Sequence, residues 1–312
     1  MSQRWQPVSP ADAGEVSKLL SALAEADGTE EFYEPEDVVE ELSSATVDAE
    51  LDTIAVWVDG ALAGYGAVTV STGRFDGRGT AFLQGGVHPQ FRGQGFGRQI
   101  MEILEPRARA LGAVRHPGRE LLLRVSGGLD GDPVRPLLAR RGYQPVRYFH
   151  EMTLPLPAEL DLAGLPATQV YTAAVSESTR LAHNEAFADH WGATGNDEQR
   201  WAEFVGARAF RPGLSFVAVA ADGQVDGYSM IQEWVAGEAY ASIVGVRPRA
   251  RRRGLGRACL GASVRAATEQ GYRVIELAVD TQNAHGAGGL YTSLGFTTKK
   301  TFTGYGKVVP PL

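Results

Sequence analysis

The sequence predicts an α+β fold: a mixed, mostly antiparallel sheet with a central parallel pair of strands, built twice in tandem. The main observation is a glycine-rich turn that occurs at 87–97 and again at 246–256. Each turn follows an apolar, strand-like run and leads into a helix pattern. An antiparallel hairpin pattern around Asp-Gly precedes each of them, at 59–60 and at 222–223. Hairpins combined with a short β-α-β unit indicate a mixed sheet.

The first half of the chain shows each element of this fold in order. Apolar residues at helical spacing, such as Val16, Leu19 and Leu23, predict a helix over 12–26. Pro35 stands where a second helix begins. The predicted elements are helices 12–26 and 35–42, a hairpin of 53–58 and 61–70, strand 81–87, helix 95–111, buried strand 120–125, a helix through Leu137 and Leu138, and a final pair of strands that ends near 154.

The order restarts after a segment punctuated by Pro155, Pro157 and Pro166. We therefore expect an N-terminal domain over 1–154, a linker over 155–169 and a C-terminal domain over 170–312. The second set of elements is helix 178–188, a hairpin of 214–220 and 224–234, strand 240–246, helix 254–270, buried strand 274–279, helix 287–294 and closing strands from 296 onward.

The composition limits the classes of function. The 312 residues suffice for two domains with their own cores, and the net charge of −7 argues against a nucleic-acid partner. Cys259 is the single cysteine, so a disulfide within the chain and a thiolate metal cluster are excluded; it is expected to pack in a helix, and no metal is expected. The N-terminus has no apolar signal region and no segment has the length of a membrane span, which predicts a cytoplasmic protein without a membrane partner.

The glycine-rich turns themselves suit a pyrophosphate. A helix start leaves backbone N–H groups free, and the helix dipole adds partial positive charge there. Arginines crowd around the second turn, where their guanidinium groups are expected to meet phosphates: Arg247, Arg249, Arg251, Arg252, Arg253 and Arg257. A dinucleotide-binding fold does not fit, because antiparallel hairpins precede the turns.

These residues resemble the signature of the GCN5-related N-acetyltransferase (GNAT) family, Arg/Gln-x-x-Gly-x-Gly/Ala before a helix. Arg92-x-x-Gly95-x-Gly97 and Arg251-x-x-Gly254-x-Gly256 both match it. The stretch from Asn283 to Phe296 is similar to the family's N…A..LY…GF motif. The tandem arrangement, and the segment 184–192, resemble mycothiol synthases and related actinobacterial members of the family.

The resemblance implies acetyl-CoA (coenzyme A) as cofactor, with its pyrophosphate on the turn and its pantetheine arm along the strand 242–246. Glycines let the backbone approach the phosphates without a Cβ in the way. The implied cofactor-binding residues are Val244, Val246, Arg251, Arg252, Arg253, Gly254, Leu255, Gly256, Arg257 and Asn283 in the second copy, and Val87, Arg92, Gly93, Gln94, Gly95, Phe96 and Gly97 in the first. Arg252 stands where the family often has glycine.

The resemblance also implies the catalytic residues. Tyr291 matches the family tyrosine that protonates the leaving thiolate, and a phenol remains protonated at neutral pH. Glu233 is the candidate general base, at a position where the family often places a carboxylate that acts through water. Glu238, Asp189 and His190 are rival bases. Asp189, His190 and Trp191 lie in the loop expected over the acceptor substrate. For His285, a purely structural role at a helix N-terminus is also consistent with the sequence.

The two halves are not equivalent. Aligning 290–296 with 137–143 places Leu138 opposite Tyr291, and Leu138 cannot donate a proton. We therefore expect the C-terminal domain to be catalytic and the N-terminal domain to be non-catalytic, with a turn still suited to acetyl-CoA.

Two hypotheses of function follow. The first is an acetyl-CoA-dependent N-acetyltransferase that acts by direct attack of a primary amine of a small molecule; a mycothiol synthase-like acetylation of a cysteinyl pseudodisaccharide is a narrower form of it. The second is a non-catalytic acyl-CoA-binding regulatory protein. The expected partner is a small-molecule amine, and both a monomer and a homodimer are consistent with the sequence.

Overall fold

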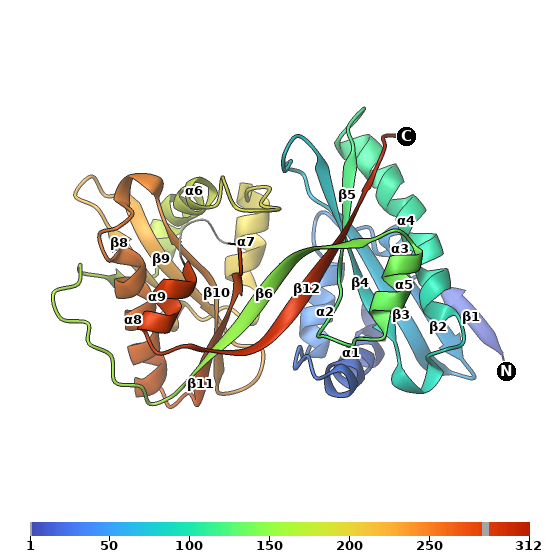
Figure 1. The fold of residues 1–312 in the computed structure, drawn as a ribbon, viewed down its shortest axis with the longest axis horizontal. Helices are drawn as coiled ribbons and strands as arrows, with labels where there is room; N and C mark the ends of the chain where they lie inside the picture. The colour runs from blue at the N-terminus through green and yellow to red at the C-terminus, as the bar shows by residue number, and fades with distance from the viewer. Residues whose placement is uncertain (1, 283–286) are drawn as a thin grey trace. The chain divides into compact units, whose positions relative to one another are not determined.

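The computed structural model describes residues 2–282 and 287–312. The chain forms two compact units (Figure 1). The N-terminal unit comprises Met1–Tyr148 with Phe302–Leu312, and the C-terminal unit comprises Phe149–Thr301. In the described ranges, no helix is both long and apolar enough to span a membrane.

The N-terminal unit has a mostly antiparallel sheet in which β4 and β5 are the parallel pair. Its strands, in spatial order, are β1 (Gln3–Gln6), β2 (Thr53–Val58), β3 (Ala61–Val70), β4 (Gly79–Val87), β5 (Leu121–Ser126) and β12 (Thr297–Val309). Its helices are α1 (Ala13–Asp27), α2 (Pro35–Leu42), α3 (Ala49–Asp52), α4 (Phe96–Arg115) and α5 (Val134–Arg140).

The two faces of this sheet carry different helices because successive strand residues point to opposite sides. Val68 and Leu83 face α4, in a cluster with Ile100 and Leu104. Tyr65 belongs to the cluster on the other face, under α1 and α2. The predicted hairpin of 53–58 and 61–70 and the predicted helix 35–42 have these same bounds in the structure.

The C-terminal unit repeats this arrangement, with β10 and β11 as the parallel pair. Its strands, in spatial order, are β6 (Gln144–Pro155), β11 (Val274–Asp280), β10 (Glu238–Val246), β9 (Val225–Gln232), β8 (Phe216–Val219) and β7 (Gln169–Val170). Its helices are α6 (Ser176–Ala186), α7 (Glu198–Gly206), α8 (Leu255–Glu269) and α9 (Ala287–Ser293). The α+β class and the mixed, mostly antiparallel sheet are thus confirmed.

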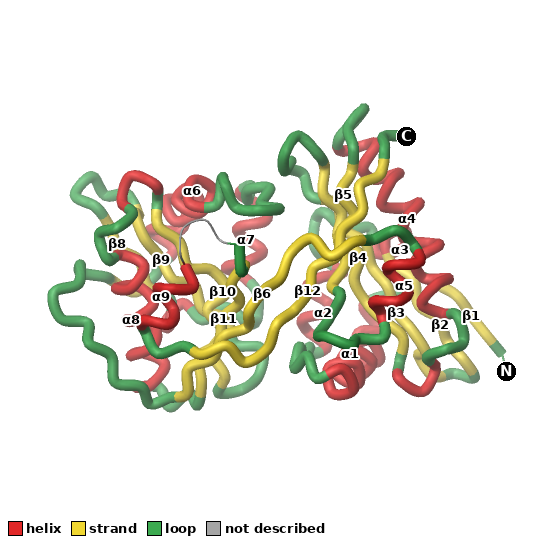
Figure 2. Tube along the Cα trace, viewed as in Figure 1, coloured by secondary structure: helices red, strands yellow, loops and turns green. Residues whose placement is uncertain are grey.

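The final pair of strands expected in each half is a single long strand, β6 or β12 (Figure 2). Residues 149–155 of β6 pair with β11 in the C-terminal unit, and residues 304–309 of β12 pair with β5 in the N-terminal unit. The segment 144–155 contains no Gly, Asn or Asp, and its two prolines stand near its ends, so nothing in its middle favours a hairpin turn. The compact units therefore differ from consecutive domains, since each includes one strand segment from beyond the expected boundary.

The expected linker also has a structural role in the C-terminal unit. Leu156 and Leu160 pack against its main apolar cluster. Leu162 lies 2.4 Å from the position that a Cβ on Gly261 of α8 would occupy. The segment between β6 and β7 is therefore packed along α8.

The strand exchange predicts an effect of removing residues 302–312. Because these residues pair with β5, deletion exposes the β5 edge and the apolar surface beside it, while the pairing of β6 with β11 is kept. Hydrogen exchange followed by mass spectrometry should show lost protection in β5 and unchanged protection in β11. Loss confined to β11 would contradict the exchanged pairing.

Candidate active site

The two glycine-rich turns have the same backbone conformation. In each, a short 3-10 helix, Pro89–Phe91 or Pro248–Ala250, is followed by an extended arginine. The next residue has positive φ, +78° at Gly93 and +64° at Arg252. The helix N-cap is left-handed glycine in both, with φ of +87° at Gly95 and +79° at Gly254. Arg252 is thus a non-glycine residue in a conformation that favours glycine.

Each turn leaves backbone N–H groups without partners. In the described chain, the amides of 93–98 and of 252–257 make no backbone hydrogen bond, whereas the next amides, of Gln99 and Ala258, donate to the carbonyls of Gly95 and Gly254. Free amides at the N-terminus of a long helix form a site for an anion. Both turns therefore fit the pyrophosphate that the sequence pattern implies.

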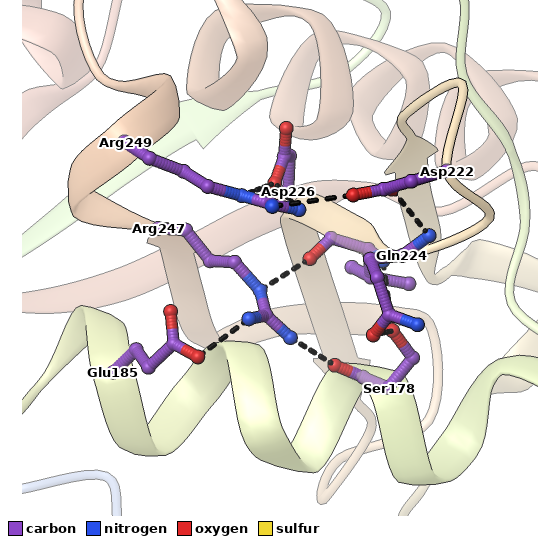
Figure 3. Close-up of polar contacts among 8 residues, drawn as sticks. Ser178, Glu185, Asp222, Gln224, Asp226, Arg247 and Arg249 are labelled. Carbon is purple, nitrogen blue, oxygen red and sulfur yellow. Dashed lines mark hydrogen bonds and ion pairs between the residues drawn. The ribbon is translucent and has the colours of Figure 1, made fainter.

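Most of the arginines at the second turn do not face this site. Arg247 is buried, and its guanidinium donates to the Val225 carbonyl at 2.8 Å and to Glu185 at 2.5 Å (Figure 3). Arg249 pairs with Asp226 at 2.8 Å and with Asp222 at 3.2 Å. The expectation that these two arginines meet phosphates is corrected, because nearby carboxylates hold them.

Three further arginines are also held by groups of the protein, and two are exposed. Arg251 donates to the carbonyl of Ala186 at the end of α6, and Arg92 pairs with Asp27, the last residue of α1, at 2.6 Å. Arg257 donates to Ser293 and to the Asp161 carbonyl. The signature arginines therefore fasten each turn to the first helix of its unit. Arg252 and Arg253 are exposed, and no contact to either is found in the described chain.

The strands that lead to each turn separate from their parallel neighbours. β10 pairs with β11 only over Glu238–Tyr240, although it runs on to Val246 paired with β9. A β-bulge at Ser242 marks the point of divergence, and the Ser242 hydroxyl donates to Gln232 at 2.5 Å. One edge of 242–246 is thus unpaired in the described structure, as an extended pantetheine arm requires.

Tyr291 lies in α9 and belongs to the apolar cluster against which Val244 of β10 packs. It is only 7% exposed, and burial raises the pKa of its phenol to about 12. Its hydroxyl has no hydrogen-bond partner within 2–282 and 287–312. A buried, protonated donor without a partner fits the acid that the sequence pattern implies.

The structure supports the alignment of Leu138 with Tyr291. The amide of Tyr143 donates to the Leu138 carbonyl at 3.0 Å, and the amide of Phe296 donates to the Tyr291 carbonyl at 3.1 Å. Leu138 is fully buried in α5. The N-terminal unit therefore has a turn of the same shape with an apolar side chain in place of the phenol.

Tyr228 and His183 were missed by the sequence reasoning. The Tyr228 phenol is buried on β9, lies beside its cross-strand partner Gly245, and is hydrogen-bonded to Nδ1 of His183 at 3.0 Å. A Cβ on Gly245 would lie 2.1 Å from the Tyr228 hydroxyl, so the tyrosine needs glycine there. Repulsion from Tyr291 contributes to the raised pKa of Tyr228, which places the two phenols near each other.

A repeated sequence signal marks this tyrosine. The pattern Asp-Gly-x-x-x-Gly-Tyr occurs at 59–65 and at 222–228. It places Tyr65 opposite Gly86 in the N-terminal unit, as Tyr228 lies opposite Gly245 in the other. Burial, together with charge from Arg200 and His190, lowers the pKa of His183 to about 4, so this imidazole is neutral at pH 7.

Glu233 is held by several donors. Its carboxylate accepts hydrogen bonds from Arg211 at 2.6 Å, from the Tyr272 hydroxyl at 2.8 Å and from the Gly237 amide at 2.8 Å. Burial raises its pKa, but the hydrogen bonds from Gly237, Tyr272 and Arg211 outweigh burial and lower it. A carboxylate stabilised in this way is a weak base, which favours a structural role for Glu233.

The other candidate bases differ in how many of their polar atoms already have a partner. Glu238, the first residue of β10, points to the same side of the sheet as Tyr240, and one of its oxygens pairs with Arg273 at 3.0 Å. Its other oxygen has no partner in the described structure. The His190 ring contacts that of Phe187 with the centroids 5.2 Å apart, and its Nδ1–H donates to the Trp191 carbonyl at 3.1 Å. Asp189 is exposed in the same loop. Asn283 and His285 lie outside the described residues.

Comparisons with known proteins agree with this geometry. The model of the Acetyltransferase (GNAT) family matches residues 18–116 and 176–296. The chain therefore belongs to the GNAT family of acetyltransferases, with two family segments in tandem.

Relatives share this organisation over most of their length. A mycothiol acetyltransferase of Pseudarthrobacter chlorophenolicus is 30% identical, with 93% of this chain and 90% of the relative covered. One of Stackebrandtia nassauensis is 29% identical, with 97% of each covered. The crystal structure of a GCN5-related N-acetyltransferase from Sphaerobacter thermophilus has a TM-score of 0.76 at 25% identity, covering 99% and 96%. A tandem GNAT protein from the clavulanic acid biosynthesis pathway has a TM-score of 0.65 at 20% identity and shares the fold over both chains.

The positive φ of Arg252 predicts a stabilising substitution. Arg252→Gly removes the left-handed strain of a side chain, so the free energy of unfolding should rise by about 0.5–1 kcal/mol after the entropy cost of glycine. Denaturant unfolding measures this difference.

Arg253→Gly is the matched control, because it removes the same charge next to Arg252 at a residue without positive φ. It should lower the free energy of unfolding instead. Equal effects of the two substitutions would show that the φ of Arg252 carries no strain.

Proposed function

We propose that this chain transfers the acetyl group of acetyl-CoA to a primary amine of a small molecule, and that the C-terminal unit performs the transfer. One observation carries the proposal: the second turn lies in the same unit as the buried phenol of Tyr291, which has no hydrogen-bond partner among the described residues, whereas Leu138 occupies that place in the first unit. Acyltransferase activity itself is a property of the family.

The residues of the C-terminal unit provide a binding path for the cofactor, which supplies the reactive thioester. The free amides from Arg253 to Gly256 and the exposed side chains of Arg252 and Arg253 receive the pyrophosphate. The unpaired edge of 242–246, with Val244 and Val246, pairs with the pantetheine amides. The first turn offers the same amides with Gly93 and Gln94 in place of the arginines, so we propose weaker, non-catalytic binding there.

The reaction needs two proton transfers, one to the leaving sulfur and one from the attacking nitrogen, and we assign each to a side chain. Tyr291 donates its phenolic proton to the departing thiolate sulfur as the acceptor nitrogen forms its bond to the acetyl carbon. The nitrogen must lose a proton, and we propose that Glu238, which has one oxygen without a partner in the described structure, takes it through water. Glu233 supports this region through Arg211 and Tyr272.

The relatives favour a narrower form of this proposal. Those at about 30% identity are named mycothiol acetyltransferases, and they support a mycothiol synthase-like acceptor, the amine of a cysteinyl pseudodisaccharide. Turnover with that amine, compared with a panel of other primary amines, tests the narrower form. Acetyl-CoA binding without transfer to any amine would support a regulatory acyl-CoA-binding protein instead.

Substitution of Tyr291 tests the acid. Tyr291→Phe keeps the ring and removes the proton donor, so kcat should fall by at least about tenfold with little change in acetyl-CoA affinity. Steady-state kinetics and calorimetric titration with acetyl-CoA provide the two measurements. Tyr143→Phe, the same change at a buried tyrosine of the N-terminal unit, is the control and should leave kcat unchanged. Wild-type turnover of Tyr291→Phe would reject the role.

A comparison of Glu238→Gln with Glu233→Gln tests the base. Glu238→Gln should reduce kcat with little loss of stability. Glu233→Gln should lower the free energy of unfolding by about 1–3 kcal/mol at pH 7, because hydrogen bonds to a charged group are weakened.

The pH dependence separates the two roles further. The pKa of Glu233 is lower in the folded than in the unfolded chain, so its contribution to stability is present above about 4.5 and is lost as the pH falls below it. The stability difference between wild type and Glu233→Gln should therefore shrink in acid. A loss of kcat at unchanged stability in Glu233→Gln would identify it as the base instead.

A further inference from the structure

A second polar site lies in the N-terminal unit, on the face of the sheet under α1 and α2. Glu41, near the end of α2, accepts a hydrogen bond from Nε2 of Gln84 on β4 at 3.0 Å. Gln84 is three residues before Val87, where the first glycine-rich turn begins. This places a carboxylate on the α1 and α2 face of the unit in which Leu138 stands at the position of Tyr291.

A buried phenol is directed to the same place. Tyr65 on β3 is 2% exposed, and its hydroxyl has no hydrogen-bond partner in the described chain. Burial, followed by repulsion from Glu41, raises the pKa of Tyr65, so the phenol and the carboxylate are neighbours. The pKa of Tyr33 is raised by burial and by the same carboxylate. Strands β3 and β4 and helix α2 therefore bring Tyr65, Gln84 and Glu41 to the same part of this face.

The charged groups that shift the pKa values of Glu41 and Tyr33 are all acidic. The pKa of Glu41 is raised to about 7, because burial and Asp37 of the same helix raise it more than the hydrogen bond from Gln84 lowers it. Glu31, in the segment before α2, acts on Tyr33 as well. No cation among the described residues shifts the pKa of Glu41; Arg124 on β5 stacks on Phe82. Glu41 is partly buried and Gln84 is exposed, so the carboxylate can be reached from solvent. A partly buried carboxylate without a countercharge has a desolvation cost, which a bound cation reduces.

The hydrogen-bond acceptors of Glu41, Gln84 and Tyr65 match a primary ammonium group. A primary ammonium has three N–H donors and no acceptor. Glu41, the side-chain oxygen of Gln84 and the Tyr65 hydroxyl supply three acceptors, of which the carboxylate provides the charge. A neutral amide has no positive charge to pair with the carboxylate, and an anion is repelled by it.

The C-terminal unit shows that the fold does not require this arrangement. The equivalent Tyr228 has a partner in His183, which is neutral at pH 7. The free phenol and the partly buried acid are therefore particular to the N-terminal unit.

We propose that Glu41, Gln84 and Tyr65 form a binding site for the ammonium group of a small primary amine in the N-terminal unit. The site is separate from Tyr291 and does not depend on catalysis by the C-terminal unit.

Ethanolamine is a suitable probe, because it stays protonated between pH 6 and 8, and N-acetylethanolamine is its neutral counterpart. Titration of the ¹⁵N-labelled full chain should shift the side-chain amide signal of Gln84 and the backbone signal of Tyr65 with ethanolamine alone. Affinity should rise from pH 6 to pH 8 as the Glu41 carboxyl group loses its proton. The side-chain ¹³C titration of Glu41 should move to lower pH when ethanolamine is saturating.

Substitutions of the three acceptors complete the test. Glu41→Gln should weaken binding by at least about tenfold, and Tyr65→Phe by about two- to tenfold, because one charged and one neutral hydrogen bond are lost. Glu36→Gln, an exposed position of α2, is the matched control and should bind as wild type does. If Glu41→Gln fails to fold, Tyr65→Phe and the ¹³C titration decide.

Three outcomes would overturn the proposal. They are equal shifts with N-acetylethanolamine, ethanolamine shifts confined to the C-terminal unit, and unchanged affinity in both Glu41→Gln and Tyr65→Phe.

Discussion

The left-handed backbone at Gly95 and Gly254 is the constraint on which both units depend. With φ near +80°, this one glycine turns the chain from the extended end of the glycine-rich turn into a long helix, without a capping side chain. The amides of the first helical turn then stay free, since no side chain caps them. The same bend fixes the helix against the sheet, where Gly64 and Gly227 permit close approach of Ile100 and Leu255.

Around this shared backbone, the two units differ in the side chains that face ligands. The second turn carries Arg252 and Arg253 with Tyr291 nearby, whereas the first carries Gly93 and Gln94 with Leu138. The difference follows from single positions, because the turns themselves have equal backbone angles. Because the free amides belong to the backbone, they are present in both copies whatever side chains the turn and the last helix of each unit carry.

Local features were predictable from the sequence, and long-range partners were not. The hairpin and the helix that begins at Pro35 have clear turn and cap signals, and Leu138 was matched with Tyr291 by alignment alone. α7 was missed although Asp197 caps it by accepting from the Arg200 amide. The phosphate role expected for Arg247 failed because its partner, Glu185, is 62 positions away in the chain. The exchange of β6 and β12 depends on pairings between residues that are even farther apart.

The repeated Tyr-opposite-Gly pair shows where the two copies diverged on their acceptor side. In both units a tyrosine of the hairpin lies opposite a glycine of the strand that leads to the turn. A neutral imidazole completes this pair in the C-terminal unit, and that polarity suits a deprotonated amine. In the N-terminal unit an uncompensated carboxylate stands beside it and favours the charged ammonium form, which has no lone pair for attack. The same scaffold thus presents opposite conditions for an amine in its two copies, and under the proposed function the unit that disfavours the positive charge is the one that provides the phenol of Tyr291.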